Sequence, residues 1–301
     1  MTLKIVDTHF HFYDKKINHH PFLTNNDEKL ALLWGEKYHQ QLPESYLPID
    51  YFKDMKDFQI EHLIMAELVS TNPIKEMKFA EDLALKMHYP SATIANINLR
   101  DKNISETLNQ YLKNPLIRSV RDHLLWDPNN PQHCYTDKND ILKEPIVEES
   151  FSILQSYPFN FEFEIYAHDI PLAIHYAKKF PTISFALHCL GWPIDQTGAG
   201  FKSWKKNMQK LSECANVFVK ITAIECIFGL KWSFKQIEPW IKETIAIFGA
   251  SRCMFGSHLP ITKLSQGVSV LYKAYQDSVV NLSVKEQQSL FADTAKVFYK
   301  L

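Results

Sequence analysis

Eight short runs of β-branched and aromatic residues recur along the chain, and longer stretches with a helical spacing of apolar residues lie between them. The runs span Leu3–His9, His62–Glu67, Thr93–Asn98, Ile117–Arg121, Phe161–Tyr166, Ile183–His188, Asn216–Ile221 and Arg252–Ser257. The helical stretches include Ile74–Met87, Ile104–Leu112, Ile170–Lys179, Trp204–Cys214, Phe234–Phe248 and Val284–Tyr299. Strands that alternate with helices run parallel, and eight such units close into a barrel. The sequence therefore predicts an α/β fold, a (β/α)8 TIM barrel.

Two connections are longer than such a barrel requires. Residues 12–59 follow the first strand, and residues 122–160 form a second long loop after the fourth strand. Connections that follow barrel strands lie over the C-terminal mouth, where barrel active sites are built. Because residues 12–59 are rich in aromatic side chains, we expect them to form a lid or a pocket wall. No Gly/Ser-rich linker or repeat interrupts the chain, which predicts a single domain over residues 1–301.

Charge and cysteine content narrow the classes of partner and compartment. The formal net charge of −1 gives no reason to expect binding to nucleic acid or to an anionic membrane. No secretory leader and no run of about 18 apolar residues is present, so no membrane association is expected. The five cysteines are odd in number and include no Cys-x-x-Cys pair, which favours a reduced, cytoplasmic compartment. We expect a small-molecule substrate, and homo-oligomerisation stays open.

The first strand carries a group of polar residues with ligand chemistry. Alternation along a strand places Asp7, His9 and His11 on one face and Val6 and Phe10 on the other. Imidazole nitrogens bind zinc and other divalent transition metals, and a neighbouring carboxylate can ligate the metal or orient the histidines. Chance is the alternative, since thirteen histidines give several close pairs.

Polar residues also end most of the other strands. Because the C-terminal ends of barrel strands converge above the core, these side chains are expected to meet at the mouth. They are His9 and His11 at the end of strand one, Glu67 at the end of strand two, Arg121 at the end of strand four, His168 after strand five, His188 at the end of strand six, Lys220 near the end of strand seven and His258 after strand eight. The convergence predicts an active site at the C-terminal mouth.

Five segments in order resemble a known family over almost the whole chain. They are Val6-Asp7-Thr8-His9-Phe10-His11, Ile117-Arg118-Ser119-Val120-Arg121, Ala186-Leu187-His188-Cys189-Leu190-Gly191, Asn216-Val217-Phe218-Val219-Lys220 and Arg252-Cys253-Met254-Phe255-Gly256-Ser257. The set resembles the amidohydrolase-related metal-dependent hydrolases, in the branch that contains sugar-lactone and pyrone-dicarboxylate lactonases. The resemblance implies a metal-dependent hydrolase that opens a small cyclic ester, which is a sugar or carboxylated lactone.

The resemblance also implies roles for individual residues. His9, His11 and His188 would bind a divalent metal, with zinc expected and manganese or no metal as alternatives. Arg121 would hold a substrate carboxylate or sugar oxygen, because its planar fork matches carboxylates. Further substrate contacts would come from Glu67, His168 and Lys220; Lys220 alternatively pairs with Glu162 or Asp7. The predicted catalytic residues are His258, His188 and Arg121.

One position departs from the family pattern. The residue after Gly256-Ser257 is normally an aspartate that acts as general base or metal ligand, and here it is His258. A neutral histidine can still accept a proton, or it can bind the metal instead. Glu164 is a candidate for the missing acid, although a polar layer inside the barrel is the favoured interpretation of that residue.

Two other classes of function remain open. Relatives in the wider superfamily use similar barrels for decarboxylation or hydration, and release of carbon dioxide separates decarboxylation from hydrolysis. A catalytically altered small-molecule binder is the other alternative, because the aspartate of strand eight is replaced by His258. The fold alone does not choose between these classes.

Overall fold

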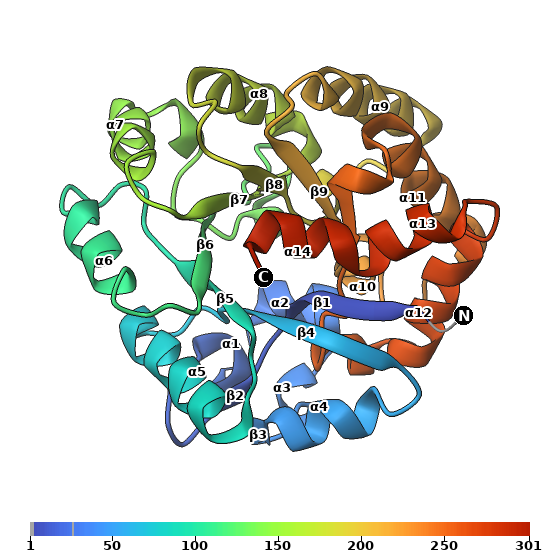
Figure 1. Cartoon of the computed structure of the whole chain (residues 1–301). Helices are drawn as coiled ribbons and strands as arrows, with labels where there is room; N and C mark the ends of the chain where they lie inside the picture. The colour runs from blue at the N-terminus through green and yellow to red at the C-terminus, as the bar shows by residue number, and fades with distance from the viewer. Residues whose placement is uncertain (1–2, 26) are drawn as a thin grey trace.

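The computed structural model describes residues 3–25 and 27–301 and contains eight parallel strands arranged in a ring (Figure 1). The strands are β1 (Lys4–Phe10), β4 (Gln59–Ala66), β5 (Ala92–Asn96), β6 (Ile117–His123), β7 (Asn160–Glu164), β8 (Phe185–Leu187), β9 (Val217–Ile221) and β10 (Cys253–Phe255). Neighbours in the chain are neighbours in the sheet, in the order β1-β4-β5-β6-β7-β8-β9-β10. Each predicted run overlaps one of these strands, so the (β/α)8 barrel prediction is confirmed.

The barrel closes where the residues after β10 meet the end of β1. The backbone N–H of His258 donates to the carbonyl of His9 at 2.6 Å, and the N–H of His11 donates to the carbonyl of Leu259 at 2.8 Å. Gly256 makes this approach feasible, because a Cβ at that position would lie 2.8 Å from the Cβ of His9 and 2.9 Å from its backbone nitrogen. The closure therefore places two predicted site histidines side by side.

Helices cover the outside of the ring (Figure 1). They are α4 (Pro48–Asp54), α5 (Pro73–Met87), α6 (Ile104–Tyr111), α7 (Pro145–Leu154), α8 (Ile170–Lys179), α9 (Gly198–Ser212), α11 (Phe234–Phe248) and α12 (Val268–Ser278). Each buries one apolar stripe, as Ile237, Trp240 and Ile241 do in α11. Within residues 3–25 and 27–301, no helix has the length and apolar character needed to cross a membrane.

The two long connections contain secondary structure. Residues 12–59 include the antiparallel pair β2 (Tyr13–Asp14) and β3 (Ser45–Tyr46), the short helices α1 (Pro21–Thr24), α2 (Glu28–Trp34) and α3 (Tyr38–Gln41), and finally α4. The prediction of a loop over residues 122–160 is wrong for residues 145–154, which form α7. Pro145 starts that helix, and Val147, Phe151 and Leu154 bury one face of it, a helical spacing that the sequence analysis overlooked.

The last helical segment crosses the N-terminal end of the barrel (Figure 1). It consists of α13 (Val284–Gln288), a π-helical turn (Ser289–Asp293) and α14 (Thr294–Tyr299). Ala292 and Phe298 pack into the interior cluster that contains Val6 and Met254. The side-chain amide of Asn160, the first residue of β7, donates to the carbonyl of Phe298. The segment therefore plugs the end of the barrel opposite the predicted mouth.

The closure at Gly256 yields a stability prediction. Gly256→Ala is expected to lower the free energy of unfolding by about 1–3 kcal/mol, because the new methyl group overlaps His9 and lies 3.0 Å from the Thr222 hydroxyl. Chemical denaturation measures the change. Gly198→Ala is the matched control, since nothing lies within 4 Å of its added Cβ. Equal stability of the two variants would contradict the close contact between β1 and β10.

Candidate active site

Four histidines from three parts of the chain meet at the C-terminal mouth of the barrel. His9 lies 5.1 Å from His11, 5.1 Å from His188 and 4.6 Å from His258, measured between ring centroids. All four side chains are buried. The structure thus brings together the histidines that the sequence analysis placed at the ends of strands one, six and eight.

An irregularity in β1 separates Asp7 from these histidines. The register between β1 and β4 shifts between Asp7 and Phe10, so the alternation of faces does not run through this stretch. The Asp7 carboxylate accepts a hydrogen bond from the Tyr51 hydroxyl of α4 at 2.7 Å and another from the backbone N–H of Ser257 at 2.8 Å. Val6 instead packs in the barrel interior. The prediction that Asp7 shares a face with the two histidines is therefore wrong. Asp7 instead connects β1 to α4 and to the residues after β10.

His9 and His11 are each held through one ring nitrogen. The Nδ1 of His11 lies 2.9 Å from the carbonyl oxygen of Ala66, and the Nδ1 of His9 lies 3.2 Å from the Thr222 hydroxyl. A carbonyl only accepts, so Nδ1 of His11 carries the proton and Nε2 keeps its lone pair. Burial, with the nearby His258, lowers the pKa of both rings well below the usual value. Both histidines are therefore neutral at pH 7, the state that binds a metal.

His188 is fixed from below by Glu162. The Glu162 carboxylate pairs with Nε2 of His188 and accepts hydrogen bonds from the Lys220 ammonium and the Tyr299 hydroxyl, both at 2.8 Å. All four side chains are buried. Burial and Lys220 lower the pKa of His188 to about 4, so its ring is neutral with Nδ1 unprotonated. Of the two alternatives for Lys220, pairing with Glu162 is the one observed.

His258 is paired with a carboxylate that the sequence analysis missed. Its Nδ1 lies 2.6 Å from a carboxylate oxygen of Glu225, and both side chains are buried. Glu225 belongs to the short helix α10 (Ile224–Phe228), which begins soon after β9 ends. The sequence feature that could have identified Glu225 is its position, a few residues after the end of the predicted seventh strand. The carboxylate absent at position 258 is thus supplied next to it by Glu225.

A second cluster of charged residues joins β4, β6 and β7. The Arg121 guanidinium donates from Nε to the Glu67 carboxylate at 2.6 Å and from Nη2 to the Glu67 carbonyl at 2.9 Å. His123 lies between two acids, with Nε2 2.8 Å from Glu67 and Nδ1 2.7 Å from Glu164. Arg121 also approaches Glu164 at 3.4 Å. These four residues are called the ion-pair network below.

The ion-pair network contains equal numbers of positive and negative charges. Burial opposes the charge on His123, but Glu164 and Glu67 raise its pKa to about 10. Arg121 and His123 in turn hold the pKa of Glu67 and of Glu164 below the usual value, against the effect of burial. At pH 7 two cations therefore face two carboxylates. Sequence analysis missed His123, although it lies two positions after Arg121 in β6 and so on the same face.

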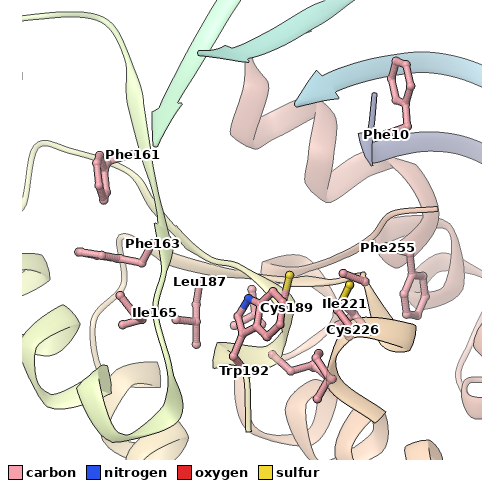
Figure 2. Packing of buried hydrophobic residues seen from close by; sticks show 14 of the residues in the cluster. Phe10, Phe161, Phe163, Ile165, Leu187, Cys189, Trp192, Ile221, Cys226 and Phe255 are labelled. Carbon is pink, nitrogen blue, oxygen red and sulfur yellow. The ribbon is translucent and has the colours of Figure 1, made fainter. Parts of the chain in front are cut away.

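A cavity lies over the histidines and the ion-pair network, with a volume of ≈ 740 Å³ that includes its opening to solvent. The described residues that line it are His9, His11, Phe22, Leu30, Leu33, Trp34, Leu68, Val69, Arg121, His123, Leu125, Tyr135, Glu164, Cys189, Trp192, Ala223, Cys226 and His258. Figure 2 shows Trp192, Cys189 and Cys226 in the apolar packing beside it. The long connection over residues 12–59, called the insertion below, supplies part of the pocket wall through Phe22, Leu30, Leu33 and Trp34.

Three predicted substrate contacts do not reach this cavity. Its described lining residues do not include Glu67, Lys220 or His168. Glu67 and Lys220 are fully buried and committed to Arg121 and Glu162, respectively. The His168 side chain is 41% exposed, and its Nε2 lies 3.0 Å from the carbonyl of Trp126. Glu67 and Lys220 therefore hold other site residues in place, and His168 lies outside this cavity.

The histidines have the geometry and chemistry of a metal site. His9, His11 and His258 offer ligand atoms that all lie within 4.8 Å of one another, as do His9, His188 and Cys189. The Nε2 of His9 is buried and has no hydrogen-bond partner among the described residues. A buried polar atom of this kind is costly unless a ligand satisfies it. The donor set of neutral imidazoles suits zinc and related divalent ions, so the residues fit the metal that the sequence analysis expected.

The raised pKa of His123 gives a pH prediction. A pKa raised above the unfolded value of about 6.5 stabilises the fold fully below that pH, and the contribution is lost as pH rises toward 10. The free energy of unfolding should therefore fall by a few kcal/mol more in the wild type than in His123→Gln between pH 6.5 and 10. Denaturant titrations at several pH values measure this. His175→Gln, on the surface of α8, should keep the wild-type slope, and a shared slope in all three proteins would refute the effect.

Two relatives in sequence can be compared with the chain. It is 25% identical over 301 residues to the uncharacterized protein y4mH of Sinorhizobium fredii, covering 99% of each chain. It is 20% identical over 199 residues to the L-fucono-1,5-lactonase of Burkholderia ambifaria, covering 66% of this chain and 65% of the lactonase.

Solved structures with the same fold include hydrolases and a decarboxylase. An amidohydrolase from Burkholderia multivorans with bound zinc has a TM-score of 0.79 at 18% identity, covering 99% of each chain. A putative 2-pyrone-4,6-dicarboxylic acid hydrolase from Pseudomonas putida has a TM-score of 0.71 at 16% identity, covering 100% of this chain and 98% of the other. A 2,6-dihydroxybenzoate decarboxylase from Rhizobium has a TM-score of 0.59 at 11% identity, covering 100% of this chain and 99% of the decarboxylase.

A protein-family model settles the classification. The model described as Amidohydrolase matches residues 6–301, which run from within β1 through α14. The resemblance read from the five sequence segments is confirmed by this match. The chain belongs to the amidohydrolase family.

Proposed function

We propose that the protein hydrolyses a small cyclic ester, a lactone, at the histidine cluster with the help of a divalent metal, zinc by preference. The observation that carries the proposal is the convergence of four histidines, each held through one ring nitrogen: His9, His11 and His258 line a cavity, and His188 lies against His9. Membership of the amidohydrolase family and the similarity to a lactonase, a pyrone-dicarboxylic acid hydrolase and a zinc-bound amidohydrolase support it.

His9, His11 and His188 would hold the metal. Their rings are neutral, and the contacts with Thr222, Ala66 and Glu162 set which nitrogen of each ring stays free. A divalent ion bound there supplies Lewis acidity toward a carbonyl oxygen and toward water. Arg121, anchored by Glu67, borders the cavity and would support negative charge on the substrate during the reaction.

His258 would accept the proton. Its Nδ1–H donates to Glu225, which leaves the lone pair of Nε2 for a proton from water. Water adds to the lactone carbonyl carbon, the ring C–O bond breaks, and the proton passes from His258 to the leaving alkoxide oxygen. The product is an open-chain hydroxy acid. Glu225 is a positioning residue here, since its carboxylate accepts the Nδ1–H and so orients the imidazole.

Decarboxylation of a small carboxylic acid is the second candidate. The similarity in fold to a 2,6-dihydroxybenzoate decarboxylase and the apolar side of the cavity favour it. Carbon dioxide release without hydrolysis of any lactone would select this reaction. Ligand binding without turnover, in metal-supplemented and in chelated protein, would instead indicate a binding protein.

Metal content gives the primary test. Purified protein is expected to hold about one divalent ion per chain and to hydrolyse lactones, and chelation should abolish the activity. His11→Ala should lose the ion and the activity together, because it removes one of the imidazole ligands. His19→Ala, on an exposed position of the insertion, is the control and should keep both. Elemental analysis and a lactone hydrolysis assay provide the measurements, and full activity in metal-free protein would defeat the metal-dependent mechanism.

The role of His258 is tested separately. His258→Gln should lower kcat by about 10²- to 10⁴-fold, the usual contribution of a general base, while the metal content stays at the wild-type value. Glu225→Gln should lower kcat less, since the imidazole remains. Because His258 also has ligand spacing with His9 and His11, loss of the ion in His258→Gln would identify it as a metal ligand and exclude the base role.

A further inference from the structure

We infer that the substrate is an uncharged lactone with an apolar body, such as an alkyl- or aryl-substituted cyclic ester, rather than a sugar lactone or a carboxylated lactone. The inference rests on the proposed function, because it names the substrate class of that same cavity. Two properties of the cavity wall support it. Most of the lining side chains are apolar, and the two cationic lining residues already form ion pairs with buried carboxylates.

The first property is the lack of aliphatic hydroxyl and amide side chains among the described lining residues. Among the described lining residues there is no serine, threonine, asparagine or glutamine. Apolar and aromatic residues face one another instead: Phe22, Leu30, Leu33 and Trp34 from the insertion, and Leu68, Val69, Leu125, Trp192 and Ala223 from the barrel loops. A polyhydroxylated lactone would leave its hydroxyl groups without partners along this wall, which weakens binding.

The few polar atoms on that wall have partners or are buried. The indole N–H of Trp34 donates to the sulfur of Cys226 at 3.2 Å. The Tyr135 hydroxyl lies 3.5 Å from the carbonyl of Lys29. The indole nitrogen of Trp192 is buried and has no partner among residues 3–25 and 27–301, and it offers a single donor. One N–H suits one ester or ether oxygen, and it does not match the several hydroxyl groups of a sugar ring.

The second property is the charge balance of the ion-pair network. The cationic residues that line the cavity in the described chain are Arg121 and His123. Arg121 already directs Nε and Nη2 at Glu67, and His123 is held between Glu67 and Glu164. A substrate carboxylate would therefore compete with two resident carboxylates for the same cations. An uncharged substrate meets no such competition.

A substrate series tests the inference directly. Rates are measured for γ-butyrolactone and for γ-lactones with longer alkyl chains, beside glucono-1,5-lactone and a carboxylated γ-lactone. We expect kcat/KM to rise about three- to fourfold per added methylene until the cavity is filled, as apolar surface leaves water. Glucono-1,5-lactone and the carboxylated lactone should be turned over at least about a hundredfold less efficiently. Preference for either of these two would overturn the inference and leave lactone hydrolysis intact.

A matched pair of variants on α2 locates the effect. Leu33 lines the cavity, whereas Leu32 is 59% exposed and does not. Leu33→Asn should reduce the gain in kcat/KM per methylene, and Leu32→Asn should leave it at the wild-type value. Thermal unfolding of both variants checks that each is folded. If kcat/KM rises by the same factor per methylene in Leu33→Asn as in the wild type, the insertion does not contact the alkyl chain of the substrate.

Binding measurements separate this inference from the proposed function. If no lactone is hydrolysed, the proposed function fails, and calorimetric titration of the same compounds still decides the substrate class. Affinity that increases with alkyl chain length supports an apolar, uncharged ligand. Tighter binding of glucono-1,5-lactone or of the carboxylated lactone, or no binding of any of them, overturns it.

Discussion

The hydrogen bonds that close the barrel between β1 and the residues after β10 are the interaction on which the site depends. They join the backbone of His9 to that of His258 and the backbone of His11 to that of Leu259, so the closure of the fold and the spacing of the histidines are one structural fact. Gly256 permits the contact, and the Asp7 carboxylate holds the same corner through Ser257 and Tyr51. His9 in the first strand is thereby placed against His258, which follows the last strand of the barrel.

Much of this arrangement is predictable from the sequence for simple geometric reasons. Apolar periodicity marks the eight strands, and parallel strands must bring their C-terminal ends together, so histidines at positions 9, 11, 188 and 258 converge. Local departures from regular structure are harder to predict. The irregularity in β1 turns Asp7 away from the site, and Glu225 reaches His258 from a short helix rather than from a strand. His123 was missed because β6 runs two residues further than its apolar pattern indicates.

Two kinds of buried charge are built around the cavity. In the first, the Glu162 carboxylate contacts His188, Lys220 and Tyr299, and all four side chains are buried. A buried cluster of this kind is stable only because its polar groups form hydrogen bonds with one another. Beside the cavity, the ion-pair network is partly open, since the His123 side chain is 22% exposed. The first cluster sets the orientation of a site residue, and the second shapes the charge that a substrate encounters.

The plug formed by α14 has a consequence for how the protein is made. Tyr299 in that helix touches Glu162, which in turn touches His188, while His9 belongs to the first strand. A ribosome releases these residues in order, so a nascent chain that already exposes seven strands still has neither the closing contact at Gly256 nor the plug. Apolar strand edges and the N-terminal end of the barrel interior would then be exposed until α14 has been synthesised. Contacts of such long sequence separation form late, so the interior of the barrel is exposed to aggregation until the chain that forms α14 has been synthesised.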